Sequence, residues 1–265
     1  AGRAQSPRLS LIVPRERQRI AFVKALYWDL KASLKREKDD ETSAFEAKLE
    51  SVNGKRVASG KDFDAVTGSL LEGRDVVVLT EEESAELQGR IADSSWQVMS
   101  VVEKRFSSRP AAPFITSSLQ QEGNRKLRLS ARDTMRTAQR LYEQGFITYM
   151  RTDSPVLSQE GLIGARNTIT QLYGDDYLSA EARQFNPSAR DAQEAHEAIR
   201  PAGETFVHPD ETGLSGQEKA LYELIWKRTL ASQMAEAQKS SVTAKIKAGD
   251  AVFSATGTRI LFPGY

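Results

Sequence analysis

The sequence of 265 residues contains no cysteine and only two histidines, His196 and His208. Without cysteine the chain cannot form disulfides, use a thiolate as nucleophile or bind zinc through sulfur. Two histidines leave little for a histidine-rich metal site. Because intracellular proteins seldom depend on disulfides, the composition favours a cytoplasmic location.

Long apolar runs are also missing. No stretch approaches the roughly 20 apolar residues that a membrane-spanning helix needs. Residues 1–6 lack the apolar core of a signal peptide and do not begin with methionine. We therefore expect no membrane association, and we expect the chain to be a fragment of a longer protein.

Neither sign of charge is in excess, since 37 Lys and Arg stand against 36 Asp and Glu. The net charge of +1 gives no indication of a nucleic-acid partner. The distribution is less even, because residues 103–140 hold nine Lys and Arg against three acidic residues. That segment could bind phosphates, and it could equally be a solvated helix face.

Hydrophobic periodicity divides the chain into a mostly β part, a helical block and a returning β part. A helix is predicted over 8–25, with a kink or restart at Pro14 because proline lacks the backbone N–H. A turn is predicted at Asn53-Gly54, and Thr80 with Glu83 forms a capping box. Strands are predicted over 27–34, 45–52, 75–79, 96–105 and within 241–262, and helices over 81–91, 115–121, 131–144, 158–173 and 217–233. The helical block is thus an insertion in a β domain.

The connection from Gly145 to Pro155 contains Tyr149, Arg151 and Asp153. In an extended segment these three side chains project from one face. A phenol has a pKa of about 10, so a tyrosine that attacks phosphate needs a cation nearby, and Arg151 offers a planar fork for phosphate oxygens. The alternative is that Tyr149 is a half-buried core aromatic.

A second segment, 192–201, contains His196 and Arg200. In a helix these residues are four apart and share a face, which would present a titratable donor and a fixed cation to a phosphodiester. The alternative is an amphipathic turn whose histidine caps or packs locally.

Residues 146–154 (FITYMRTDS) resemble the active-site signature of type IA DNA topoisomerases of the bacterial kind, and residues 192–201 (AQEAHEAIRP) resemble a second motif of that family. The remaining similarity lies in residues 1–7, 27–28, 113–121 and 138–143. The resemblance covers nearly the whole chain.

The resemblance implies an α+β fold in which a helical, tyrosine-bearing domain is inserted into an arched β-rich domain. Residues 1–26 would be a helical segment of the DNA-binding domain IV, 27–108 with 237–265 the β-rich domain II, and 109–236 the helical domain III. It also implies an ATP-independent isomerase that cleaves single-stranded DNA through a 5′-phosphotyrosine link, passes a strand, reseals the break and relaxes negative supercoils.

The resemblance assigns roles to individual residues. Tyr149 would be the nucleophile, Arg151 would stabilise the scissile phosphate, and His196 would assist near the active site. Further DNA contacts are expected from Arg3, Gln5, Thr148, Asp153, Ser154 and Arg200.

One part of the family pattern has no counterpart in the chain. The family holds Mg²⁺ on an acidic cluster of a Toprim domain that precedes the segment where this sequence begins. Asp39-Asp40-Glu41 lies in a predicted polar loop and does not replace that cluster. The fragment is expected to bind no metal and to be inactive alone in relaxation, while the intact protein is expected to be a monomer that acts on DNA in the bacterial nucleoid.

Three other classes of function are the alternatives. A non-catalytic module for single-stranded nucleic acid would explain the basic segment but not Tyr149 and Arg151. A tyrosine recombinase, a type IB enzyme or a relaxase would need dispersed cationic residues around a C-terminal tyrosine, or a histidine triad, and neither pattern is present. A purely structural scaffold is the third possibility.

Overall fold

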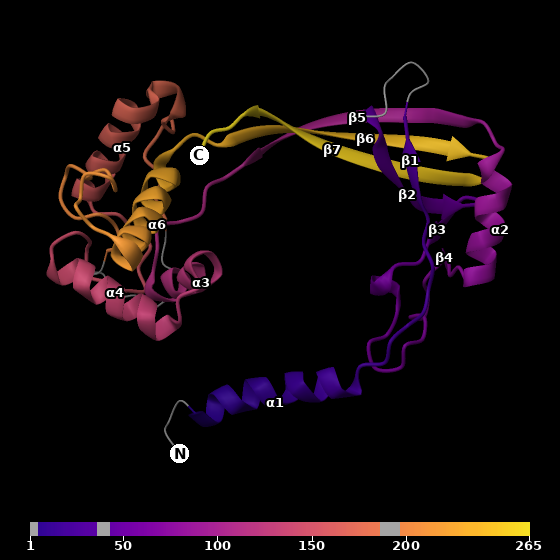
Figure 1. The fold of residues 1–265 in the computed structure, drawn as a ribbon, viewed down its shortest axis with the longest axis horizontal. Coiled ribbons are helices and arrows are strands. Elements are labelled where there is room, and N and C mark those ends of the chain that lie inside the picture. The colour runs from indigo at the N-terminus through magenta and orange to yellow at the C-terminus, as the bar shows by residue number, and fades with distance from the viewer. Residues whose placement is uncertain (1–4, 36–42, 186–196) are drawn as a thin grey trace. The chain divides into compact units, whose positions relative to one another are not determined.

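The computed structural model describes residues 5–35, 43–185 and 197–265 (Figure 1). The chain forms two compact units, unit 1 from Ala1–Lys104 with Ser241–Thr258, and unit 2 from Arg105–Ser240 with Arg259–Tyr265. It passes between them three times, within the strands β5, β6 and β7. Helices and one sheet together give the predicted α+β class.

The sheet has seven strands in the order β4-β3-β2-β7-β6-β5, with β1 paired to β2. Their bounds are β1 Lys31–Leu34, β2 Phe45–Val52, β3 Lys55–Val57, β4 Val76–Val77, β5 Trp96–Ser108, β6 Ala237–Ala248 and β7 Ala251–Phe262. Asn53 and Gly54 both have positive φ, 51° and 78°, as the predicted tight turn between β2 and β3 requires. The strands predicted over 27–34 and 75–79 are shorter than expected.

The core of unit 1 lies where alternate residues of the strands meet the helix α2, Glu81–Ala92. Leu87 and Ile91 of α2 are buried with Leu49 and Phe253 of the sheet. The predicted capping box is present: Thr80 Oγ1 accepts from the Glu83 N–H at 3.2 Å, and the Glu83 carboxylate accepts from the Thr80 N–H at 2.9 Å.

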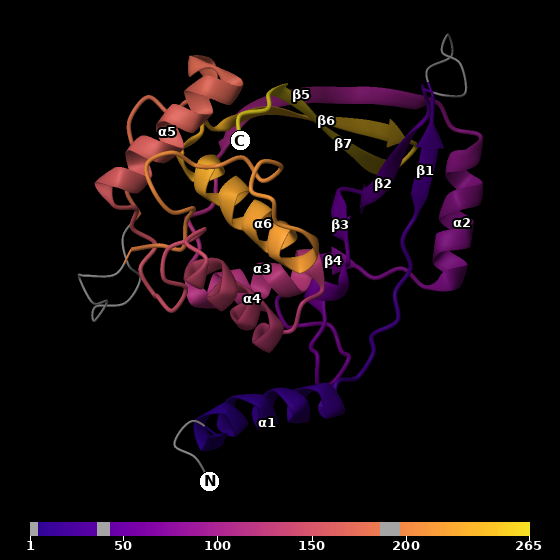
Figure 2. The same ribbon diagram turned by 60° about the vertical axis from the view of Figure 1, so that its left-hand side comes forward.

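Helix α1, Gln5–Ala21, runs through Pro14 without a restart, so the predicted restart was wrong (Figures 1 and 2). Proline removes the bond from its own nitrogen to the carbonyl of Ser10, and its ring crowds that carbonyl. Side chains 6–21 are all exposed, so water can solvate that carbonyl and the remaining helical bonds suffice.

Asp62, in the short 3-10 turn Gly60–Asp62, is a buried acid in unit 1. Its carboxylate accepts from Arg56 at 2.5 and 2.9 Å and from the Ser59 N–H at 2.8 Å. The Arg56 guanidinium first, and the Ser59 N–H second, hold the pKa of this carboxyl well below its ordinary range.

A depressed folded-state pKa contributes stability above the unfolded pKa, near 4, and that contribution is lost as the pH falls towards the folded value. We therefore expect Asp62→Asn to be less stable than the wild type at pH 7, and the gap to shrink at pH 3. Urea unfolding of both proteins at pH 7 and pH 3 measures the difference between their free energies of unfolding. An equal difference at the two pH values would contradict the lowered pKa of Asp62.

Unit 2 contains the helices α3 Thr116–Leu127, α4 Ala131–Glu143, α5 Gln159–Tyr173 and α6 Gly216–Gln233, with a 3-10 turn at Asp175–Tyr177. Helix α6 contacts the other three helices, and Figures 1 and 2 show it at the centre of the unit. Leu221, Tyr222, Ile225 and Leu230 of α6 are buried in the unit's core. Burial raises the pKa of Tyr222 to about 12, and its hydroxyl donates to the Val207 carbonyl.

Helix α3 extends six residues beyond its predicted end at Gln121. Gly123 lies within this extension, although glycine weakens an isolated helix. In the structure Gly123 is buried against α4, and a Cβ there would lie 2.7 Å from the Thr134 hydroxyl oxygen. The glycine therefore permits the two helices to approach closely.

We expect Gly123→Ala to destabilise unit 2 by about 1–3 kcal/mol, because the added methyl overpacks the contact with Thr134. The matched control is Gly89→Ala, at an exposed position of α2 with no atom within 4 Å of the added methyl. That change should stabilise by about 0.5–1 kcal/mol through helix propensity. Urea unfolding compares the two, and equal effects would refute the close approach.

Candidate functional site

The segment after α4 brings a tyrosine to the surface of unit 2. Gly145, with φ of 79°, ends the helix, and the chain continues to Ser158 without regular structure. Tyr149 is 45% exposed, and Arg151 and Asp153 are also exposed. Their neighbours at the alternate positions are buried: Met150, Thr152 and Ser154. Exposure thus alternates with a period of two over 149–154, and Tyr149 lies at the surface of the unit, so the alternative of a core aromatic does not apply.

Tyr149 packs against one other aromatic ring. The ring of Tyr142, in the last turn of α4, meets it edge to face with a centroid distance of 5.3 Å. Tyr142 is itself 41% exposed. Arg151 forms no ion pair with any residue that the structure describes, so its guanidinium is free to bind a phosphate. An exposed phenol and an exposed arginine without an ion pair to any described residue therefore lie two positions apart in the sequence.

Thr148 joins this segment to the second motif. Its N–H donates to the Arg200 carbonyl at 2.9 Å, and its hydroxyl donates to the Ala198 carbonyl at 2.8 Å. The same hydroxyl accepts from the Arg200 N–H at 3.0 Å. The structure thus places the two sequence motifs side by side, although Thr148 and Ala198 are fifty positions apart in the sequence.

Thr116, the first residue of α3, holds the other side of Tyr149. Its hydroxyl lies 2.8 Å from the Met150 carbonyl and 3.0 Å from the Thr152 carbonyl, and it accepts from the Thr152 N–H at 2.9 Å. The Thr116 N–H also donates to the Thr152 carbonyl. Sequence reasoning did not assign Thr116 a role, because only the folded chain brings α3 to the tyrosine segment.

The helical geometry considered for 192–201 is wrong for the described part of that segment. From Glu197 onward the chain is not helical, and Ile199 and Pro201 form bridges with Phe114 and Ile147. The backbone groups of 199–201 are used in these pairings, which a helix would forbid. His196 lies outside the described residues.

Arg200 is 2% exposed, and its guanidinium faces protein. All five N–H donors have oxygen partners: the two carboxylate oxygens of Glu197, the Ser158 hydroxyl, and the carbonyls of Pro201 and Gly203. Glu160 adds an ion pair at 3.5 Å. A Cβ at Gly161 would lie 2.6 Å from Arg200 Cδ, so a glycine makes room for the side chain. In this arrangement Arg200 is a buried hub that connects the second motif to α5.

The other predicted DNA contacts differ in position. Asp153 is exposed beside Arg151, whereas Ser154 is buried and its hydroxyl accepts from the Val156 N–H. Arg3 lies outside the described residues, and Gln5 begins α1.

The basic segment 103–140 is partly neutralised by local ion pairs. Arg109, Arg125, Arg136 and Arg140 pair with Glu236, Glu122, Asp133 and Glu218. The hydrogen bond from Arg125 lowers the pKa of Glu122. Arg128 and Arg132 are exposed and form no ion pair within the described part of the chain. The segment therefore contains both ion-paired and unpaired basic residues among those that the structure describes.

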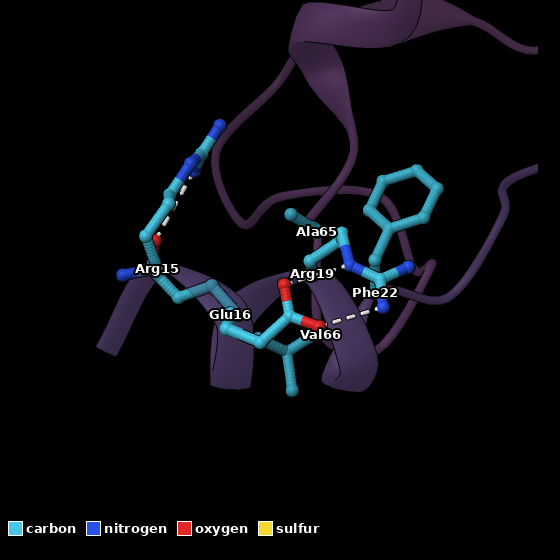
Figure 3. A pocket seen from close by; sticks show the side chains of 7 residues that line it. Arg15, Glu16, Arg19, Phe22, Ala65 and Val66 are labelled. Carbon is cyan, nitrogen blue, oxygen red and sulfur yellow. Dashed lines mark hydrogen bonds and ion pairs between the residues drawn. The ribbon is translucent and has the colours of Figure 1, made fainter. Parts of the chain in front are cut away.

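Unit 1 contains a separate hollow between α1 and the loop at Ala65–Val66 (Figure 3). Arg19 lines it, and its guanidinium is bound by Glu16 of the same helix at 2.7 and 2.9 Å. Phe22 closes one side. The hollow presents no nucleophile, so the candidate chemistry remains with Tyr149.

Two absences hold for the residues that the structure describes. Those residues contain no group of three or more Asp, Glu or His that could bind a metal ion. None of their helices is long and apolar enough to span a bilayer.

The chain belongs to the DNA topoisomerase family, whose model matches residues 1–265. It is 55% identical to DNA topoisomerase 1 of Synechococcus elongatus and 48% identical to DNA topoisomerase 1 of Mycobacterium tuberculosis, with all of this chain and 30% of each relative covered. The structure of full-length topoisomerase I from Thermotoga maritima matches with a TM-score of 0.73 and 32% identity, over all of this chain and 39% of that one. The predicted resemblance and the α+β fold are confirmed, and the chain spans about 30% of the curated relatives it matches.

Proposed function

We propose that the intact protein is a type IA topoisomerase that cleaves single-stranded DNA through Tyr149. The supporting observation is an exposed phenol beside a free arginine, on a segment whose backbone is fixed on both sides. The comparisons add that relatives of this chain are named DNA topoisomerase 1.

In the proposed reaction the Tyr149 oxygen attacks a backbone phosphorus and loses its proton. An O–P bond forms to the tyrosine, and the bond between phosphorus and the 3′ oxygen breaks. The 3′ oxygen takes up a proton and leaves as a free hydroxyl. Resealing is the reverse, so no ATP is needed and bond energy is conserved.

Arg151 would bind the non-bridging oxygens, where negative charge increases in the transition state. His196 would assist this step, and Thr148, Asp153 and Ser154 would line the DNA path, with Arg3, Gln5 and Arg200 as further contacts. Among these, the buried positions of Arg200 and Ser154, each 2% exposed, favour supporting roles over direct contacts.

Mg²⁺ would not be held by the described residues, which lack a suitable cluster. We propose that a Toprim domain of the intact protein holds it. The intact protein would act as a monomer on single-stranded or negatively supercoiled DNA in the cytoplasm. Within it, residues 109–236 would form the tyrosine domain, 27–108 with 237–265 the β-rich domain, and 1–26 part of a further DNA-binding domain.

The test is a denaturing gel with single-stranded DNA labelled at its 3′ end, in the presence of Mg²⁺. This chain is assayed alone and with the Toprim segment supplied. A labelled protein adduct should form only when both parts are present. Relaxation of supercoiled plasmid by this chain alone would refute the division of the active site, and no adduct in either sample would leave the non-catalytic nucleic-acid module as the better description.

A further inference from the structure

A single hydroxyl group fixes the backbone on both sides of Arg151. The Thr116 hydroxyl lies within 3.0 Å of the Met150 and Thr152 carbonyls and accepts from the Thr152 N–H at 2.9 Å. A hydroxyl has one proton, so it donates to one of the two carbonyls at a time while it accepts from the N–H. Met150, directly after Tyr149, is also anchored, since it is 1% exposed.

Before Tyr149, the segment is held by the hydrogen bonds of Thr148 to Ala198 and Arg200. After Tyr149 it forms neither helix nor strand, and Thr116 supplies the hydrogen bonds to the backbone of Met150 and Thr152. The Tyr149 side chain is exposed and is steadied by the edge of the Tyr142 ring. The direction in which Tyr149 and Arg151 project therefore depends on the path of the backbone between them.

We propose that Thr116 is a positioning residue for Tyr149 and Arg151 in strand cleavage, an inference that rests on the proposed function. In-line attack on phosphorus requires the phenol oxygen and the arginine fork to be placed within a fraction of an ångström, and a displacement of about 1 Å can slow a reaction 100-fold. Removing the hydroxyl leaves the Met150 carbonyl and the Thr152 N–H without this partner, and the segment can then relax.

Thr116 tests positioning better than Thr148 does. Thr148 adjoins the nucleophile and is itself a predicted DNA contact, so its substitution would mix two effects. The Thr116 hydroxyl is directed at protein backbone, so its loss removes no predicted DNA contact. Thr116→Val keeps the branched shape without the hydroxyl, and Thr116→Ser keeps the hydroxyl.

The matched control is Thr168 in α5, a buried threonine of the same unit whose hydroxyl donates to the Gly164 carbonyl at 2.8 Å. Thr168→Val removes a side-chain hydrogen bond whose partner, the Gly164 carbonyl, lies in α5 and in neither motif. Its stability loss calibrates what a general weakening of unit 2 does to the reaction.

The experiment uses the intact enzyme. The single-turnover rate of adduct formation is measured at saturating enzyme with a 3′-labelled oligonucleotide, and affinity for the same oligonucleotide is measured in a Tyr149→Phe background. We expect Thr116→Val to slow cleavage about 10- to 100-fold with affinity changed less than about threefold. Thr116→Ser should recover most of the rate, and Thr168→Val should cleave at the wild-type rate.

The inference is overturned if Thr116→Val cleaves as fast as the wild type, if only its affinity changes, or if Thr168→Val is slowed equally. These outcomes leave the proposed function intact, because the wild type still forms the Tyr149 adduct. If the wild-type enzyme forms no adduct, or if an adduct still forms in Tyr149→Phe, the proposed function is overturned and this inference with it.

Discussion

Tyr149→Phe is expected to abolish the covalent adduct in the intact enzyme while it leaves DNA binding within about threefold. Phenylalanine keeps the ring that meets Tyr142 edge to face, so the surrounding structure should be unchanged. It lacks the oxygen that would bond to phosphorus, and no other group can replace a nucleophile at that position. The lost exposed hydroxyl should weaken binding by only about 0.5 kcal/mol.

The measurement is the denaturing-gel assay together with a binding titration on the same oligonucleotide. Tyr142→Phe is the matched control, since that residue also exposes a phenol and lies in ring contact with Tyr149. It should retain adduct formation. An adduct that persists in Tyr149→Phe but disappears in Tyr142→Phe would transfer the nucleophilic role to the other ring. Loss of binding together with loss of the adduct would point to a role in recognition.

Arg200→Met is expected to destabilise unit 2 by about 3 kcal/mol, a large effect for one substitution. The change removes all five donated hydrogen bonds and leaves Glu197 and the carbonyls of Pro201 and Gly203 without their partner. Because Thr148 pairs with the backbone of Ala198 and Arg200, the tyrosine segment should loosen as well. Urea unfolding measures the stability loss.

Arg132→Met is the control, at an exposed arginine without an ion pair to any described residue. It should change stability by less than about 0.5 kcal/mol. The same two variants also decide between a supporting role and a direct DNA contact for Arg200. Arg200→Met could instead be as stable as Arg132→Met and only bind DNA more weakly. The direct contact predicted from the sequence would then be correct, and the hydrogen bonds of the buried guanidinium would contribute little to the stability of unit 2.

Features controlled by neighbouring residues could be predicted from the sequence. The Asn53-Gly54 turn, the capping box of Thr80 with Glu83, and most helix bounds depend on contacts within a few positions. The exposed face of Tyr149, Arg151 and Asp153 follows from the period-two geometry of an extended chain.

Features controlled by distant residues could not be predicted. Gly123 weakens a helix in isolation, yet α3 continues through it because α4 packs there. Residues 197–201 have a composition that a helix tolerates, but their backbone pairs with 114 and 147 instead. Arg200 lies in a motif shared with a DNA-binding family, so the sequence suggests a DNA contact. Only the fold shows that its five N–H donors already bind oxygen atoms of the protein.

The alternation along the tyrosine segment separates side chains that fix the backbone from side chains that are available to a substrate. Residues at even positions from 148 to 154 face the protein and fix the course of the chain, whereas 149, 151 and 153 face outward. Substitutions at the outward positions can alter reactivity with little effect on folding. Substitutions at the inward positions can lower the stability of the fold while the reactive side chains are kept. A designer who wished to place a different nucleophile or cation on this surface could therefore vary three residues and keep the support unchanged.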